Sequence, residues 1–335
     1  MKKQIFSIDF GTHSIKTHFD GKDKTFLSMI APKSSFPEGT VFSDDLFILT
    51  LLETGERFVV GGSDEEISIE LNYDKEVFQK YLSSIIYRLM KLHGVNFSEP
   101  ILCMYGMSPS ISELEEHETL KAINTIKDGL DTLDFTVLSV AVGQGVNFDT
   151  EEDGYGKLLI IDVGHTSTHT MSFDGRNPLR GLNVHREIGG SYVLNRIVEN
   201  MEGFCNDYSE TRNEKFFFSD AIQCIEKGGR KMPNGDFVVG GWLHEAQNDF
   251  TRMIFENNLE ILEEAVLASD AIIVVGGGAR HLDAEVLGNG MLSSESRSKI
   301  INALYPSGDD ALYSNVRGFS KAGVLVLEDE IKDTV

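Results

Sequence analysis

The sequence of 335 residues predicts an α/β fold built from two duplicated domains. One observation is a short apolar strand followed by Asp-x-Gly, which occurs at residues 5–11 and again at 158–164. A second observation is the alternation of apolar strand-like runs with segments of helical periodicity along the chain. Such alternation is typical of domains in which helices cover a sheet, and the repeated motif indicates an internal duplication.

Each Asp-x-Gly pattern predicts a β-hairpin, because an apolar run precedes it and an alternating run follows it. An Asp-x-Gly pattern is also common in ordinary hairpin turns, so a single copy would carry little information. Two copies at equivalent places make a shared binding role the better interpretation. The expected strands cover residues 3–9, 15–20, 157–163 and 168–173.

The residue types of the two turns suit a ligand with phosphate groups. Glycine allows a close backbone approach, so that successive N–H groups of a turn can point at phosphate oxygens, and hydroxyl side chains add donors. The candidates are Gly11, Thr12 and Ser14 in the first turn, and Gly164, His165, Thr166 and Thr168 in the second.

The two aspartates cannot contact a polyphosphate without repulsion, so we expect them to bind a cation. Asp9 and Asp162 are therefore predicted to hold Mg²⁺, which usually keeps several of its waters. Lys16 is expected to act on the phosphates as a point charge. Asp9 and Asp162 are thus both the predicted metal ligands and predicted catalytic residues.

A third motif follows a buried-strand run at residues 271–275. Gly276, Gly277 and Gly278 come directly after it and predict a surface of bare backbone on which a ribose or purine can lie. Three glycines alone can also form a plain turn. Neither G-x-x-x-x-G-K-[ST] nor G-x-G-x-x-G occurs in the sequence, so the two commonest phosphate loops are absent.

In order and chemistry, these three motifs resemble the phosphate 1, phosphate 2 and adenosine motifs of the actin, Hsp70 and sugar-kinase superfamily. Within it, the chain resembles the plasmid-segregation actins of the ParM/StbA type. The segments that carry this narrower resemblance are residues 101–109, 186–190 and 314–319.

The resemblance implies an actin-like (ribonuclease H-like) fold with two domains that flank a nucleotide cleft. Domain I would comprise residues 1–155 and 318–335, with an insertion subdomain at about 31–94. Domain II would comprise residues 156–317, with an insertion subdomain at about 201–264.

The resemblance also implies further site residues. Glu226 and Lys227 correspond to a contact of the second domain with ribose and adenine, although both could equally stand at an exposed helix end. The glutamate or glutamine that orients the attacking water in the family falls here among Phe135, Leu138 and Ser139. Gln144 lies close in sequence and could serve, or could be an ordinary loop residue.

The implied function is that of a filament-forming ATPase that uses ATP or GTP with Mg²⁺ and drives plasmid segregation through a basic ParR-type adaptor. The alternatives are a small-molecule kinase and a non-polymerising ATPase or scaffold on the same fold. No clear phosphate-acceptor constellation supports the kinase, and a fold alone is a limited warrant for function.

The formal net charge of −23 argues against direct binding to DNA or to an anionic membrane and favours a basic partner protein. Acidity could instead serve solubility alone. The N-terminus does not resemble a signal peptide and no long apolar stretch is present, so we expect a cytoplasmic protein. The three cysteines lack metal-site spacing.

Three helices are expected over residues 75–93, 113–128 and 245–267 from their apolar spacing. Strand alternation could place His13 and His165 at equivalent turn positions, where they would either sense pH near phosphate or lie on the surface. An unchanged pH profile of nucleotide affinity in His165→Asn would remove the pH-sensing hypothesis.

Overall fold

The protein is described by a computed structural model in which the chain forms two compact units, Met1–Gly154 with Leu312–Val335, and Tyr155–Ala311. The domain and insertion boundaries expected from the resemblance stay a prediction. The structure describes residues 3–11, 13–28, 30–36, 46–50, 55–61, 81–107, 120–126, 134–141, 143–150, 156–179, 183–207, 216, 218–227, 230–232, 235–237, 240–256, 259–283, 286, 293–303 and 308–332.

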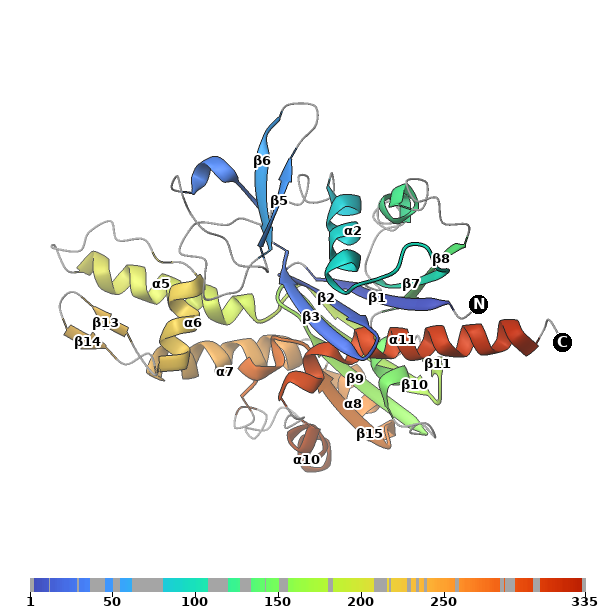
Figure 1. Ribbon diagram of the computed structural model, residues 1–335. Helices are drawn as coiled ribbons and strands as arrows, with labels where there is room; N and C mark the ends of the chain where they lie inside the picture. Colours follow the sequence, from blue (N-terminus) through green and yellow to red (C-terminus); the bar gives the residue numbers. More distant parts are fainter. Residues whose placement is uncertain are drawn as a thin grey trace. The chain divides into compact units, whose positions relative to one another are not determined.

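The first unit contains a five-stranded mixed sheet in the order β3-β2-β1-β7-β8 (Figure 1). Strands β1, β2 and β3 form an antiparallel meander, while β7 lies parallel to β1 and β8 lies parallel to β7. The carboxyl ends of β1, β7 and β8 therefore meet at one edge of the sheet. The strands are β1 (Gln4–Phe10), β2 (Ser14–Phe19), β3 (Lys22–Leu27), β7 (Ile101–Met107) and β8 (Phe135–Ala141).

Helices pack on both faces of this sheet because alternate residues of the central strands are apolar on each side. Phe6, Ile8 and Tyr105 pack with helix α2 on one face. Leu102 and Met104 pack with helix α11 on the other face. Other elements of this unit are β4 (Ile30–Pro32), η1 (Lys33–Ser35), β5 (Leu46–Thr50), β6 (Arg57–Gly61), α2 (Leu82–Leu92), α4 (Gln144–Asp149) and, from Leu312 onward, α11 (Gly308–Lys332); β4, β6 and β5 form a second, antiparallel sheet.

The second unit repeats the central pattern of the first. Strands β9 and β10 form an antiparallel hairpin, and β15 lies parallel to β9 on its other side. Strand β9 is buried along nearly its whole length, as its continuous apolar run predicts for a strand covered on both faces. The strands are β9 (Lys157–Val163), β10 (Thr168–Asp174), β11 (Asn177–Pro178), β12 (Val184–Arg186), β13 (Arg230–Met232), β14 (Gly235–Phe237) and β15 (Ala271–Val275).

The core of the second unit forms between β9 and a group of helices. Leu159 and Ile161 pack with Val193 and Ile197 of α5 and with Phe250 of α7. The helices are α5 (Ser191–Asp207), α6 (Phe218–Lys227), α7 (Gly240–Glu256), α8 (Leu259–Ala268), η3 (Ala279–His281) and α10 (Ser294–Ala303).

The strands expected from the sequence are confirmed. The expected helix over 245–267 is helical in all of its described residues, which belong to α7 and α8, and residues 257 and 258 lie outside the described part. Helix α2 lies within the expected range 75–93, and residues 120–126 are helical within 113–128. Residues 75–80, 113–119 and 127–128 of those two ranges lie outside the described part.

In the described part of the chain, no helix is both long and apolar enough to cross a membrane.

Candidate functional site

The first Asp-x-Gly pattern forms the predicted hairpin turn between β1 and β2. The amide of Gly11 donates to the Ser14 carbonyl at 3.1 Å, which closes the turn. A Cβ at Gly11 would lie 2.6 Å from that carbonyl oxygen, so the turn requires glycine. The Nζ of Lys16 is 3.7 Å from the same Cβ position, so the lysine side chain points back over the turn, and its action on phosphates stays a prediction.

Ser28 anchors this turn, and sequence reasoning missed it. Its hydroxyl donates to the Gly11 carbonyl at 2.6 Å, and its amide donates to the His13 carbonyl at 2.7 Å. The residue is fully buried directly after β3. Only the pairing of β3 with β2 places Ser28 beside the turn, and no local pattern marks it.

Asp9 lies one residue before the end of β1 and is only 8% exposed. Burial raises the pKa of its carboxyl above the ordinary value, and the charge of Lys16, its cross-strand partner, partly offsets this. A cation beside the carboxylate would favour the charged form further. Asp9 is therefore suited chemically to a hard divalent cation.

The edge that holds Asp9 also carries Gln144. Asp9 pairs with Gly106 of β7, where a Cβ would lie 3.1 Å from the Asp9 Oδ1 atom. Gly106 in turn pairs with Val140 near the end of β8. Gln144 follows as the first residue of α4, half-buried, so it stands at a helix start and not in the loop that we considered.

The second Asp-x-Gly pattern forms the same turn between β9 and β10. The amide of Gly164 donates to the Ser167 carbonyl at 2.8 Å. Asp162 is 8% exposed and pairs across the strands with His169, as Asp9 pairs with Lys16. The Thr168 hydroxyl is buried and donates to the Ile188 carbonyl at 2.8 Å. Its proton therefore takes part in a hydrogen bond inside the second unit and is not directed at a ligand.

Three glycine segments meet at this second turn. The amide of Gly190 donates to the Gly164 carbonyl at 2.9 Å, and the amide of Gly278 donates to the Val163 carbonyl at 2.8 Å. A Cβ at Gly278 would lie 2.5 Å from the Gly164 oxygen, and one at Gly190 would lie 2.9 Å from the Gly278 Cα. Only residues without side chains allow this approach of one backbone to another, and the surface for a ribose or purine stays a prediction.

Gly276 completes the junction. It follows β15 with φ +90°, a conformation that favours glycine, and a Cβ there would clash with the Val163 carbonyl and lie 2.6 Å from the Asp162 Oδ1 atom. The second and third motifs are distant in sequence. Their backbones therefore meet in a single close-packed junction beside Asp162.

Two histidines extend the site along the sheet. Asp162, His169 and His185 are successive cross-strand partners on β9, β10 and β12, so they share a face. The Nδ1 atoms of His169 and His185 are 3.1 Å apart, and His169 Nε2 is 3.2 Å from the Ser167 hydroxyl. Burial, helped by His185, lowers the pKa of His169 to about 4, so it is neutral at pH 7.

The structure overturns the expectation that His13 and His165 occupy equivalent turn positions. The two closing hydrogen bonds align Gly11 with Gly164 and Ser14 with Ser167. His165 therefore corresponds to residue 12, and His13 corresponds to Thr166. The sequence-based argument failed because the histidines stand at different offsets from the turn glycine.

Glu226, Lys227, Thr166 and Gly277 are the remaining predicted residues in the described part of the chain. Thr12 lies outside the described residues. Glu226 and Lys227 end helix α6, at positions whose side chains are not described. Thr166 and Gly277 are exposed on their turns.

No group of three or more His, Cys, Asp or Glu side chains that could hold a metal ion occurs among the described residues. Mg²⁺ commonly uses one or two protein carboxylates together with waters and substrate phosphates. Asp9 and Asp162, both buried beside turns that need glycine, fit that donor set.

The sequence matches no family model and no curated protein. Among solved structures, the archaeal actin homologue Ta0583 is 16% identical over 96% of this chain and 99% of its own, with a TM-score of 0.67; it has also been solved in complex with ADP. A non-polymerisable quadruple mutant of pCBH ParM is 14% identical over 97% and 100%, with a TM-score of 0.71. A 15-stranded ParM filament from Clostridium botulinum is 16% identical over 97% and 100%, with a TM-score of 0.63.

The protein therefore has the actin fold, as its sequence motifs predicted. Within that fold it is similar to ParM and to the archaeal actin homologue along nearly the whole chain. At these identities the likeness establishes the architecture, and function has to be argued from the site.

Proposed function

We propose that this chain is a nucleotide-dependent, filament-forming ATPase of the actin type, with ATP or GTP as its fuel. The observation that carries the proposal is the pair of turns: each is closed by the same hydrogen bond and follows a buried aspartate. The backbone contacts among Gly164, Gly190 and Gly278 fix the second turn beside Asp162. The similarity to an ADP-bound protein and to a filament supports both parts of the proposal.

The proposed roles follow from the chemistry of each group. Backbone amides and hydroxyls of the two turns bind the phosphates, and Lys16 adds a positive charge. Asp9 and Asp162 hold Mg²⁺, which would supply charge neutralisation of the phosphates when bound. Gln144, at the start of α4, orients the attacking water, and positioning and electrostatics supply most of the rate.

The proposed cellular role is plasmid segregation in the cytoplasm. A head-to-tail contact that does not close into a ring produces an open filament, which can push or pull a cargo. The net charge of −23 disfavours direct DNA binding, so a basic ParR-type adaptor would connect the filament to DNA.

Sedimentation of the purified chain with Mg²⁺ and ATP, GTP or ADP tests the proposal. We expect nucleotide-dependent pelleting that Asp162→Ala abolishes and that Asp174→Ala leaves intact. Asp174 is a matched control because it is exposed and ends β10, the strand that pairs with β9, at the end of the hairpin opposite to the turn. Tight nucleotide binding without assembly would favour a kinase or a non-polymerising scaffold, and absence of nucleotide binding would reject the proposal.

A further inference from the structure

Helix α11 contacts the turn that precedes Gln144 through one buried side chain. The amide of Gly143 donates to the Asn315 Oδ1 atom at 2.8 Å, across 172 positions of sequence. Gly143 has φ +82° and accepts the first hydrogen bond of α4, from the Asn147 amide at 3.0 Å. Asn315 is 8% exposed, and loss of its oxygen would leave the Gly143 N–H in the interior without this acceptor.

The backbones of α4 and α11 also touch where the two helices meet. A Cβ at Gly318 would clash with the Gly145 carbonyl, and a Cβ at Gly145 would lie 2.5 Å from the Phe319 ring. The same ring lies 2.6 Å from the Cβ position of Gly106, beside Asp9. Helix α11 therefore packs directly against both α4 and β7. Because these contacts leave no space between the backbones of α11 and α4, the position of α11 determines the position of α4.

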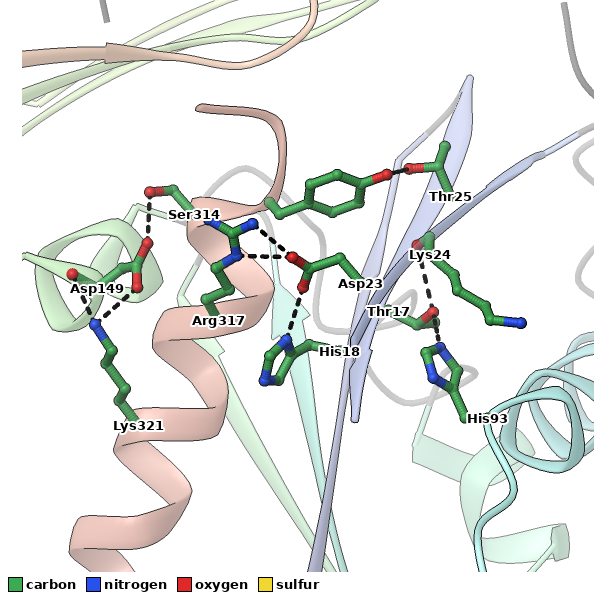
Figure 2. Close-up of polar contacts among 11 residues, drawn as sticks. Thr17, His18, Asp23, Lys24, Thr25, His93, Asp149, Ser314, Arg317 and Lys321 are labelled. Carbon is green, nitrogen blue, oxygen red and sulfur yellow. Dashed lines mark hydrogen bonds and ion pairs between the residues drawn. The ribbon is translucent and has the colours of Figure 1, made fainter. Parts of the chain in front are cut away.

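Ion pairs secure α11 on both sides of this contact (Figure 2). Arg317 donates through Nε to the Asp23 Oδ2 atom at 2.8 Å, and His18 Nδ1 lies 2.7 Å from the Asp23 Oδ1 atom. Toward α4, the Ser314 hydroxyl donates to Asp149 at 2.9 Å, and Lys321 Nζ lies 2.9 Å from the same carboxylate. The helix is thus bound both to the β2–β3 hairpin and to the far end of α4.

We propose that Asn315 is a positioning residue that sets the Gly143 turn and, through it, the orientation of Gln144. In this proposal Asn315 acts through the Gly143 turn on the group that orients the water. The inference rests on the proposed function and deepens it, because it assigns a role in turnover to a buried amide on the C-terminal helix. Nucleotide affinity, which depends on the two turns, should be largely independent of Asn315.

The test compares three variants. Asn315→Ala removes the acceptor, whereas Asn315→Asp keeps an oxygen at the same position. Ser314→Ala is the matched control, because it removes a neighbouring hydrogen bond from α11 to the other end of α4. Three quantities are measured: amide hydrogen exchange at Gly143 without nucleotide, nucleotide Kd by calorimetry, and kcat and KM for hydrolysis.

We expect Asn315→Ala to accelerate exchange at Gly143 and to lower kcat about tenfold or more, with Kd changed less than about threefold. Asn315→Asp should restore protection and most of the turnover, and Ser314→Ala should leave both unchanged. Unchanged exchange, or faster exchange with unchanged kcat, would overturn the positioning role while the ATPase proposal stands. A wild-type chain that protects Gly143 but neither binds nor hydrolyses nucleotide would overturn the proposed function, and the inference with it.

Discussion

The two hairpin turns have the same closing hydrogen bond but are anchored by different means. In the first, the side-chain hydroxyl and the amide of Ser28 donate to the Gly11 and His13 carbonyls. In the second, the amides of Gly190 and Ser191 donate to the Gly164 and His165 carbonyls. One turn thus depends partly on a single side chain, and the other depends on backbone that can approach only because glycines stand there.

The aspartates of the two turns also face different partners. Asp9 pairs across the strands with Lys16, whereas Asp162 pairs with His169, whose pKa of about 4 leaves it neutral at pH 7. The two turns therefore share the same backbone hydrogen bond and an aspartate before the glycine. They differ in the charge of the residue that pairs with that aspartate. We infer that the first turn supplies most of the electrostatic attraction for a phosphate, and that the second turn contributes mainly through the fixed geometry of its backbone.

The largest expected effect tests the backbone anchor of the second turn. Gly276→Ala adds a Cβ against the Val163 carbonyl and strains a φ of +90°, so we expect a loss of about 3 kcal/mol or more in the free energy of unfolding. Gly175→Ala is the control, since φ is +57° but nothing lies within 4 Å; it should cost about 1 kcal/mol. Denaturant unfolding measures both, and equal losses would contradict the crowded junction.

The pH dependence of stability tests the neutral His169. Because the folded pKa of His169 is about 4 and its ordinary value is 6.5, the unfolded chain binds a proton first as pH falls. This residue therefore has no effect above pH 7 and removes stability between pH 6.5 and 4, by about 2 kcal/mol at pH 5.

His169→Gln should therefore lose less stability between pH 7 and pH 5 than the wild-type chain does. His244→Gln replaces a histidine that is 59% exposed and serves as the control. Chemical unfolding at the two pH values measures the difference. An identical pH profile in wild type and His169→Gln would show that burial of His169 does not disfavour its charged form.

The charge difference between the turns predicts a difference in nucleotide affinity. Lys16→Met should weaken binding about tenfold at low salt, about 1.4 kcal/mol, and reduce the dependence of Kd on ionic strength. His169→Gln should change Kd at pH 7 less than about threefold, because it removes no charge. Calorimetric titrations at two salt concentrations measure both variants, and equal effects would remove the proposed asymmetry.

The smallest effect concerns the side-chain anchor of the first turn. Ser28→Ala removes the hydroxyl that donates to Gly11 but keeps the backbone amide, so we expect a loss of about 1 kcal/mol in stability. Ser191→Ala should change stability by less than about 0.5 kcal/mol, because its contribution to the second turn is a backbone amide. Thermal unfolding of the pair measures the contrast, and a reversed order would contradict the two anchoring modes.

Strands were the most predictable part of the fold. The runs that lead to Asp9, to Asp162 and to Gly276 were found from apolar content alone, because a strand covered on both faces must be apolar throughout. The apolar spacing across 245–267 located helical residues of α7 and α8 but missed the start of α7 at Gly240. Periodicity reports which residues face a core, and it does not report where a helix ends.

The sequence by itself determined the turn chemistry: which residues carry a carboxylate, which lack a side chain, and that the motif occurs twice. These are local properties, because φ, chirality and strand pairing act over a few residues. The tertiary structure alone decided that Ser28 anchors the first turn, that Gly190 and Gly278 meet at the second, and that Asn315 reaches Gly143. Such contacts join positions distant in the chain, and their specificity arises from close packing of backbones and from the need to satisfy buried polar groups, neither of which leaves a local pattern.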